Sequence, residues 1–202
     1  MNNTPNTRIR KLVVTGALGA LAVFLGITRL GLIPWISGAS ITVMHIPAII
    51  GAILEGPLVG CGIGAIFGVF SLYQANISPV AFDAFFRNPL VSVLPRILFP
   101  LAAWGIWWAL SRWKKIPAVI AAGLGGSIIH TVLVLGMLVA TNGSSVLTGG
   151  AEGVTLWAVV GMIFVANGLP EAAAAAILST LVVAAWLGLN TRRKKSKLSE
   201  EE

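Results

Sequence analysis

The sequence has a single cysteine and few charged side chains. Cys61 stands alone among 202 residues, so the chain can form neither an internal disulfide nor a CxxC pair or thiolate metal cage. Charged residues make up 10% of the chain and hydrophobic residues 56%, with a mean hydropathy of +0.90. This composition supplies too little polar surface to cover a soluble globule. Water is therefore not the main solvent of this protein.

Sequence signatures of enzymes are also missing. No P-loop or H-E-x-x-H motif is present, and the glycines at 60, 62 and 64 lie inside an apolar run, where small residues allow close helix packing. Ser127 and His130 are three residues apart, but the G-x-S-x-G turn that exposes a nucleophile is absent. We predict that the chain is not an enzyme and carries no cofactor. Active transport would need an ion gradient or an ATP-hydrolysing partner.

The sequence contains long apolar runs. It lacks the short segments of alternating polar and apolar residues that are typical of a membrane β-barrel. A helix needs about 20 mostly apolar residues to cross a bilayer core of about 30 Å. We therefore predict an all-α integral membrane protein, a six-transmembrane-helix bundle. Its helices are expected at residues 12–30, 41–54, 58–73, 89–110, 116–140 and 156–189, with a basic N-terminus at 1–11, a six-helix membrane domain at 12–189 and a charged tail at 190–202.

Two interruptions are predicted within this pattern. Glu55-Gly56-Pro57 indicates a tight turn between the short second and third helices, because proline cannot continue a helix interior. The last run is too long for one straight span. We expect Asn167-Gly168-Leu169-Pro170 to break it or to end a lead-in segment.

The basic residues predict the orientation. A net charge of +7 and a pI near 10.4 would suit nucleic acid, but the basic residues are clustered as in cytoplasmic loops. The clusters are Arg8, Arg10 and Lys11; Arg112, Lys114 and Lys115; and Arg192, Arg193, Lys194, Lys195 and Lys197. Six helices place all three on one side, so both termini are predicted to be cytoplasmic. We interpret the clusters as topology signals that contact lipid phosphates, without nucleic acid as a partner.

Apart from Arg29, at the outer end of the first helix, the ionisable residues inside predicted helices are His45, Arg96, His130 and Glu171. A charged side chain at the bilayer centre costs about 2.5–3.5 kcal/mol on insertion scales, so each residue is a candidate site residue. Arg96 either snorkels to the surface or faces a carboxylate, on Glu171 or on a bound anion. The histidines are either satisfied buried imidazoles or part of a site. No His-x3-His or carboxylate–His spacing occurs, so no metal site is predicted.

Asn167 lies one helical turn before Glu171, on the same face. This pair either caps a helix start, where an acidic residue favours the positive end of the helix dipole, or binds a solute. The segment between the third and fourth helices adds Tyr73, Gln74, Phe82, Arg87 and Asn88. These residues are either interfacial anchors or a lid over a solute.

The first helix carries small residues at Gly16, Gly19 and Ala20. Gly16 and Ala20 have the spacing that permits close contact with another helix. The other helix belongs either to a partner protein or to the same bundle.

These segments together resemble one membrane protein family. The residues that carry the resemblance are Met44-His45-Ile46-Pro47-Ala48-Ile49-Ile50-Gly51-Ala52-Ile53-Leu54, Gly56-Pro57, the glycine-rich run at 60–71, Arg87-Asn88-Pro89 and Asn167-Gly168-Leu169-Pro170-Glu171. They are similar to the substrate-binding S components of energy-coupling factor (ECF) vitamin transporters, over nearly the whole chain.

The resemblance implies a subunit of a bacterial cell membrane that captures a vitamin at its outer face. It would associate, through small residues such as Gly16 and Ala20, with a transmembrane coupling protein bearing two cytoplasmic ATPases, and then reorient to release the vitamin inside. The sequence looks most like the pantothenate-type members, with riboflavin, folate and cobalamin as alternatives. Arg96, and Arg87 with it, would suit an anionic carboxylate.

A different class of function is a self-sufficient ion-coupled secondary transporter or channel. Glu171 and Arg96 would then form a proton or ion relay. The two halves of the sequence show no evident inverted repeat, which disfavours this alternative.

Overall fold

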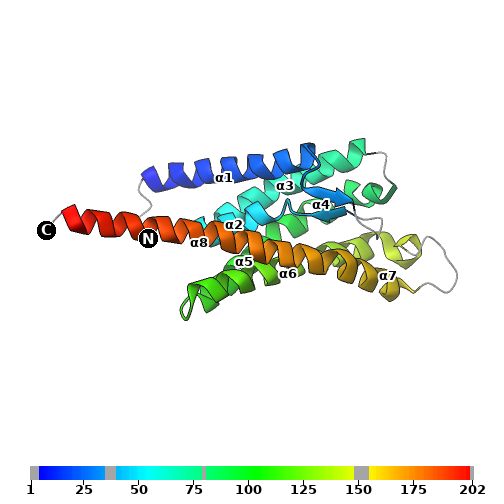
Figure 1. Ribbon diagram of the computed structural model, residues 1–202. Helices are drawn as coiled ribbons and strands as arrows, with labels where there is room; N and C mark the ends of the chain where they lie inside the picture. Colours follow the sequence, from blue (N-terminus) through cyan, green and yellow to red (C-terminus); the bar gives the residue numbers. More distant parts are fainter. Residues whose placement is uncertain (1–4, 35–39, 79–80, 148–154, 201–202) are drawn as a thin grey trace.

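The computed structural model describes residues 5–34, 40–78, 81–147 and 155–200. They form an elongated bundle of helices in which α1 begins and α8 ends at the same end (Figure 1). In this part of the chain, five helices are long and apolar enough to cross a membrane: Thr7–Ile27, Pro57–Ile77, Pro89–Leu110, Lys115–Gly143 and Leu156–Gly188. The chain is therefore a multi-pass helical membrane protein.

The predicted second helix is shorter than expected. Helix α2 covers Ile46–Glu55, only 10 residues, which reach about 15 Å at 1.5 Å per residue and cannot span a bilayer. The predicted helical start at residue 41 is wrong, because Ser40–Thr42 is strand β2 and pairs antiparallel with β1 at Leu32–Pro34. Two local features explain the later start of the helix. The β-branched residues at 41–43 favour a strand, and Pro47 suits the first turn of a helix.

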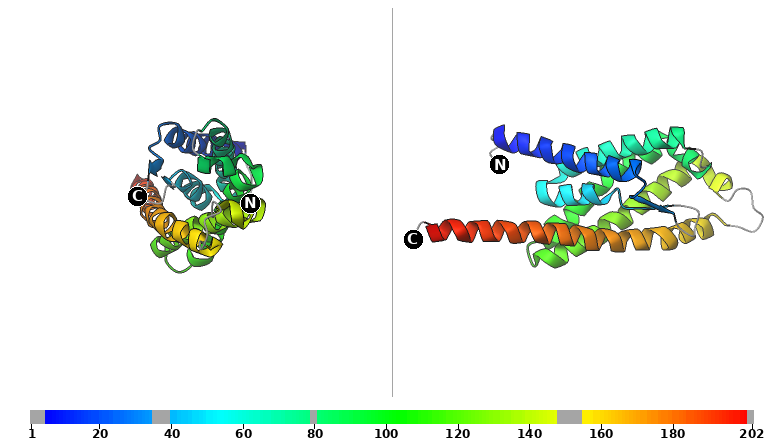
Figure 2. Two further views of the ribbon diagram at one scale, coloured as in Figure 1. Left: turned by 90° about the vertical axis from the view of Figure 1, so that its right-hand side faces the viewer. Right: turned by 45° about the horizontal axis from the view of Figure 1, so that its top comes forward.

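Helix α2 lies at the centre of the bundle. Its residues from Ile46 to Ile53 are all buried, and the end-on view in Figure 2 shows the other helices around it. The main hydrophobic core forms against this helix, through Ile49 and Ile53 with Ile63 and Phe99. A helix that is apolar on every side belongs in such a central position.

The remaining elements follow the predicted runs with shifted ends. They are α1 (Pro5–Ile27), α3 (Pro57–Ile77), the 3-10 helix η1 (Ala81–Arg87), α4 (Pro89–Ser92), α5 (Leu94–Leu110), α6 (Lys115–Leu147), α7 (Leu156–Ile163), the π-helical turn η2 (Phe164–Gly168) and α8 (Leu169–Glu200). Gly56, at φ 100°, makes the predicted tight turn between α2 and α3.

The predicted interruption near Pro170 takes the form of a π-helical turn. The N–H of Leu169 donates to the carbonyl of Phe164, while Pro170 has no N–H to donate and would clash with the carbonyl four residues earlier. The helix is wider at this turn but does not end there, because one apolar span runs from Leu156 to Gly188. Such π turns are often found at functional sites.

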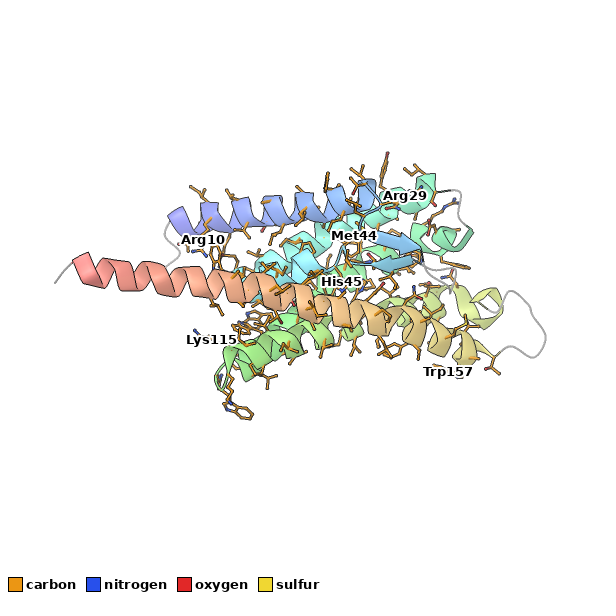
Figure 3. All side chains as sticks on the ribbon, viewed as in Figure 1. Arg10, Arg29, Met44, His45, Lys115 and Trp157 are labelled. Carbon is orange, nitrogen blue, oxygen red and sulfur yellow. The ribbon has the colours of Figure 1, made fainter. Side chains whose placement is uncertain are left out.

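The basic segments share one end of the bundle. Figure 3 shows Arg10 and Lys115 at the end where α1 begins and α8 ends, with Arg29 and Trp157 at the opposite end. Arg10 pairs there with Glu55, whose side chain is only 8% exposed. The guanidinium of Arg10 also lies 5.9 Å from the ring centroid of Trp186. Arg10 therefore links α1, α2 and α8 at the end predicted to be cytoplasmic.

Glycines let the helices approach closely where α3 crosses α5. A Cβ atom added to Gly64 would lie 1.9 Å from the backbone oxygen of Arg96, and one added to Gly68 would lie 2.9 Å from Cα of Val93. The two backbones are thus in direct contact. This contact holds the start of α5 against α3.

We expect Gly64→Ala to destabilise the protein by about 1–3 kcal/mol, because the new methyl group overpacks a backbone contact. Thermal unfolding in detergent measures the effect. Gly136→Ala is the matched control, since nothing lies within 4 Å of a Cβ at that position and alanine favours the helix by about 1 kcal/mol over glycine. Equal effects of the two substitutions would contradict the close crossing.

Candidate functional site

Five polar residues that lie far apart in the sequence gather inside the bundle. They are His45 at the start of α2, Arg96 on α5, His130 on α6, Asn167 on η2 and Glu171 on α8, and each is at most 5% exposed. We call this group the buried polar cluster. Buried polar side chains are costly without partners, so the contacts of each member determine what the cluster can bind.

The start of the short helix α2 positions His45. Figure 3 shows His45 near the middle of the bundle, and α2 runs from there to Glu55 at the basic end. The helix thus presents its positive dipole end to the protein interior at mid-depth. Half-helices that begin inside a membrane commonly direct this end at anionic groups of a solute.

The two histidine rings face each other without hydrogen bonds. Their centroids are 5.2 Å apart with planes inclined by 13°. The ring of Phe99 packs edge-on against His130 at 4.8 Å, and Phe67 lies at 6.1 Å. None of the four imidazole nitrogens forms a well-aligned hydrogen bond among the described residues, although the backbone of Thr42 lies close enough to interact with the His45 ring. Buried polar atoms without partners are rare in native proteins, so each such atom needs an explanation.

Arg96 is held inside the protein. Its Nη1 donates to the carbonyl of Val91, and its Cζ lies 5.5 Å and 5.2 Å from the ring centroids of Phe67 and Phe86. Its Nε has no partner among the described residues. The side chain is 5% exposed, so the snorkelling interpretation is wrong. Arginine keeps a free donor for an anion here.

Glu171 connects α8 to the hairpin. Its Oε1 accepts a hydrogen bond from the backbone N–H of Thr42 on β2, at 2.6 Å. Within the described residues it forms no direct ion pair with Arg96, although the two charges interact at longer range. The carboxylate thus binds β2, and it also lies in the first turn of α8, where the helix-cap interpretation expects an acidic residue. Asn167 lies one turn earlier, in η2.

The fold also brings together three groups whose sequence spacing did not suggest a metal site. One ligand atom from each of His45, His130 and Glu171 lies within 4.8 Å of the other two. They come from the turn before α2, from α6 and from α8, so no short spacing motif could reveal them. The spacing argument against metal binding is therefore insufficient.

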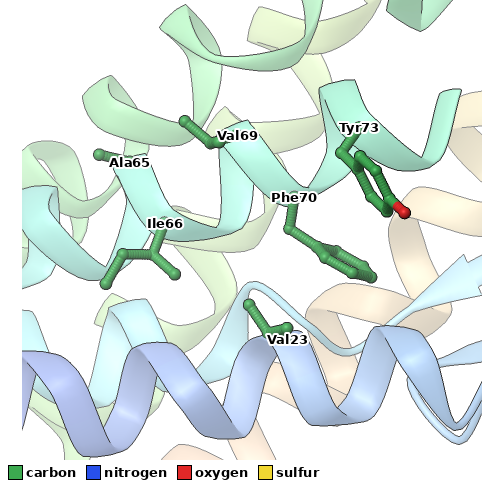
Figure 4. Close-up of a pocket in the computed structure, with 6 residues that line it drawn as sticks. All are labelled: Val23, Ala65, Ile66, Val69, Phe70 and Tyr73. Atoms are coloured by element: carbon green, nitrogen blue, oxygen red, sulfur yellow. The ribbon is translucent and has the colours of Figure 1, made fainter. Parts of the chain in front are cut away.

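Four of the other predicted site residues lie outside the buried polar cluster. Tyr73 is 61% exposed and lines an apolar groove between α1 and α3 with Val23, Ala65, Ile66, Val69 and Phe70 (Figure 4). Gln74 is half-buried on α3. Arg87 is exposed and donates from Nε to the carbonyl of Ala75 at 3.1 Å. Asn88 caps α4, accepting from the N–H of Leu90 at 3.0 Å.

A role in binding for these four residues stays a prediction. Phe82 belongs to η1, but its side chain falls outside the described residues. The neighbouring Phe86 does reach the cluster, through its contact with Arg96.

The small residues of α1 divide between two faces. Gly16 and Ala20 are exposed, and nothing lies within 4 Å of a Cβ at Gly16. Gly19 is buried against α3, where an added Cβ would lie 2.5 Å from Cδ1 of Ile66. Gly19 therefore serves packing within the bundle, while Gly16 and Ala20 remain available to a partner.

The sequence did not predict which aromatic rings and which backbone group contact the buried polar cluster. Phe67 and Phe99 contact His130, and Thr42 supplies the N–H that binds Glu171. An apolar run in the sequence does not distinguish a phenylalanine beside a site from one in the core. No local signal could have identified them.

Comparisons with known proteins agree with this architecture. Residues 10–183 match the family described as ECF transporter, substrate-specific component. The pantothenate transporter PanT of Leuconostoc mesenteroides subsp. mesenteroides is 32% identical over 117 residues, which are 54% of this chain and 55% of that protein. The chain thus spans about half the length of the curated relative it matches.

Both matches are to transport proteins, which confirms the prediction that the chain is not an enzyme. Since the family match includes the whole buried polar cluster, we conclude that this protein belongs to the family of substrate-specific components of ECF transporters.

Proposed function

We propose that the protein captures a water-soluble vitamin outside a bacterial cell and delivers it to the inside with an ATP-driven partner module. The vitamin that fits best is pantothenate. The observation that carries this proposal is the buried polar cluster, which holds an arginine and two histidines with unpartnered nitrogens at the level of the membrane. The name of the PanT relative points to the same vitamin.

The chemistry of the cluster complements that of pantothenate. This vitamin carries one carboxylate, one amide and two hydroxyl groups on an aliphatic frame. Arg96 has a free Nε for the carboxylate, and the positive end of α2 favours the same charge. Neutral imidazoles both donate and accept, so His45 and His130 suit the hydroxyl and amide groups. Glu171 and Asn167 add further hydrogen-bonding capacity.

The surroundings of these groups are apolar, as in most small-molecule sites. Phe67 and Phe99 pack against the histidines and can contact the aliphatic part of the vitamin. A bound carboxylate would also offset the charge of Arg96, whose burial in a low-dielectric interior is unfavourable. The apo cluster therefore favours an anion over a neutral solute.

A partner would provide the energy, because the sequence contains no ATP-binding motif and shows no inverted repeat of the kind found in ion-coupled transporters. The outer face of α1 offers a surface for it: Gly16 and Ala20 are exposed between the large apolar side chains of Val13 and Phe24. A transmembrane coupling protein can approach closely at such small residues. This protein would bear two cytoplasmic ATPases, at the end of the bundle where the basic residues gather.

We expect pantothenate to stabilise the detergent-purified chain more than other water-soluble vitamins do. A ligand present at about 1,000 times its dissociation constant adds about 4 kcal/mol to the unfolding free energy. Thermal unfolding against a panel that includes riboflavin, folate and cobalamin measures this. A shift with a different vitamin would correct the substrate, and no shift with any vitamin would contradict the proposal.

We further expect Arg96→Gln to weaken pantothenate binding by at least about tenfold, because a charge-assisted hydrogen bond contributes about 1.5–3 kcal/mol. Isothermal titration of the purified variant measures the loss. The alcohol analogue of pantothenate, which has a hydroxymethyl group in place of the carboxylate, should bind wild type and variant with similar affinity.

Arg112→Gln is the matched control, since Arg112 lies over the ring of Trp108 at the basic end of the bundle. Arg112→Gln should leave the affinities for pantothenate and for its alcohol analogue unchanged. If Arg96→Gln reduced binding of the acid and the alcohol equally, Arg96 would not recognise the carboxylate.

A further inference from the structure

We infer that His45, His130 and Glu171 bind a divalent first-row transition-metal ion, of the class of Zn²⁺, Co²⁺ or Ni²⁺. One ligand atom from each residue lies within 4.8 Å of the others. The three side chains are at most 5% exposed, so the site is enclosed by protein. The inference stands on this geometry and does not depend on which vitamin the protein carries.

The ligand set suits these metals. Two imidazoles and a carboxylate are typical ligands of zinc sites, and three protein ligands leave a fourth position open to an exogenous group. Mg²⁺ and Ca²⁺ prefer oxygen ligands throughout, so this combination selects against them.

The ligand atoms are free to coordinate. The imidazole nitrogens of His130 have no hydrogen-bond partner among the described residues. The ring of His45 interacts only with the backbone of Thr42 and forms no well-aligned hydrogen bond. The N–H of Thr42 holds Oε1 of Glu171 at 2.6 Å, which orients the carboxylate and leaves its second oxygen for the ion. Outer contacts of this kind commonly orient metal ligands.

Metal binding requires the ligand atoms to move closer together and one histidine ring to turn. Bonds of about 2.0–2.2 Å in a tetrahedral site place ligand atoms about 3.4 Å apart, somewhat closer than the present limit of 4.8 Å. The imidazole planes differ by 13°, so one ring must turn about its Cβ–Cγ bond for both lone pairs to meet one ion. This torsion has broad minima in histidine.

Arg96 opposes the metal ion by charge. Its guanidinium is fixed by Val91, Phe67 and Phe86, so it remains buried near the site when an ion enters. A carboxylate in the fourth coordination position would offset this repulsion. The metal should therefore bind more tightly when a small carboxylate is present, and more tightly when the positive charge of Arg96 is removed.

Titration of the full-length, tag-free, chelator-treated protein with Co²⁺ tests the inference, because tetrahedral Co²⁺ absorbs visible light strongly. The chain has two histidines and one cysteine, so a Cys61→Ser background excludes thiolate ligation. We expect saturation at one ion per chain and displacement by Zn²⁺. An absence of saturable Co²⁺ and Zn²⁺ binding would overturn the inference.

Single substitutions identify the ligands. Loss of an outer-shell partner costs about 10–100-fold in metal affinity, so His45→Gln, His130→Gln and Glu171→Gln should each cost at least about 100-fold. Ser127→Ala is the matched control, because Ser127 is buried one turn before His130 and is not a ligand. Unchanged affinity in the double variant His45→Gln/His130→Gln would show an adventitious ion only. Circular dichroism and gel filtration confirm that each variant is folded.

Arg96→Gln distinguishes metal binding from vitamin binding, which share His45, His130 and Glu171. It should raise Co²⁺ affinity by at least about tenfold through lost repulsion, whereas it is expected to lower pantothenate affinity. A fall in Co²⁺ affinity would contradict the charge argument that places the ion beside Arg96. Pantothenate binding to the chelator-treated protein is measured in parallel: if it persists while Co²⁺ fails to bind, the metal inference alone is wrong.

Discussion

The absence of water in the bilayer core is the constraint on which this structure depends. Every backbone N–H and C=O there needs a partner within the protein. Long helices meet this need by themselves, but α2 is too short to cross the membrane. The hairpin of strands β1 and β2 precedes α2, and its two strands satisfy each other's backbone groups. Glu171 accepts a hydrogen bond from the N–H of Thr42. A carboxylate of the candidate site thus also stabilises the hairpin above it.

Close helix packing connects this constraint to the site. Gly64 and Gly68 allow α3 to contact the backbone at the start of α5. Arg96 lies in this part of α5 and donates a hydrogen bond to the carbonyl of Val91. Aromatic rings on α3 and η1 then flank the guanidinium. A cation in hydrocarbon would otherwise move toward the surface. Rigid helices and rings are what keep its donor inside the bundle.

The cluster combines groups with opposing electrostatic preferences. Arg96 and the dipole of α2 favour an anion, whereas two neutral imidazoles and Glu171 favour a cation with nitrogen and oxygen ligands. Arg96 and Glu171 do not neutralise each other by direct contact in the described residues. The two ligands proposed above use these opposing preferences: a carboxylate would pair with Arg96, and a metal ion would bind the histidines and Glu171.

The sequence by itself determined the solvent, the apolar spans, the clustering of basic residues and the ionisable residues inside the spans, because the cost of charge in lipid does not depend on the fold. Only the tertiary structure decided that residues 40–42 form a strand, that Gly19 faces α3 and that His45, His130 and Glu171 converge. These features depend on how each helix is rotated and where it crosses its neighbours. A helix that is apolar on every side has no periodic pattern that reveals its rotation, so the sequence could name the candidate residues but not their arrangement.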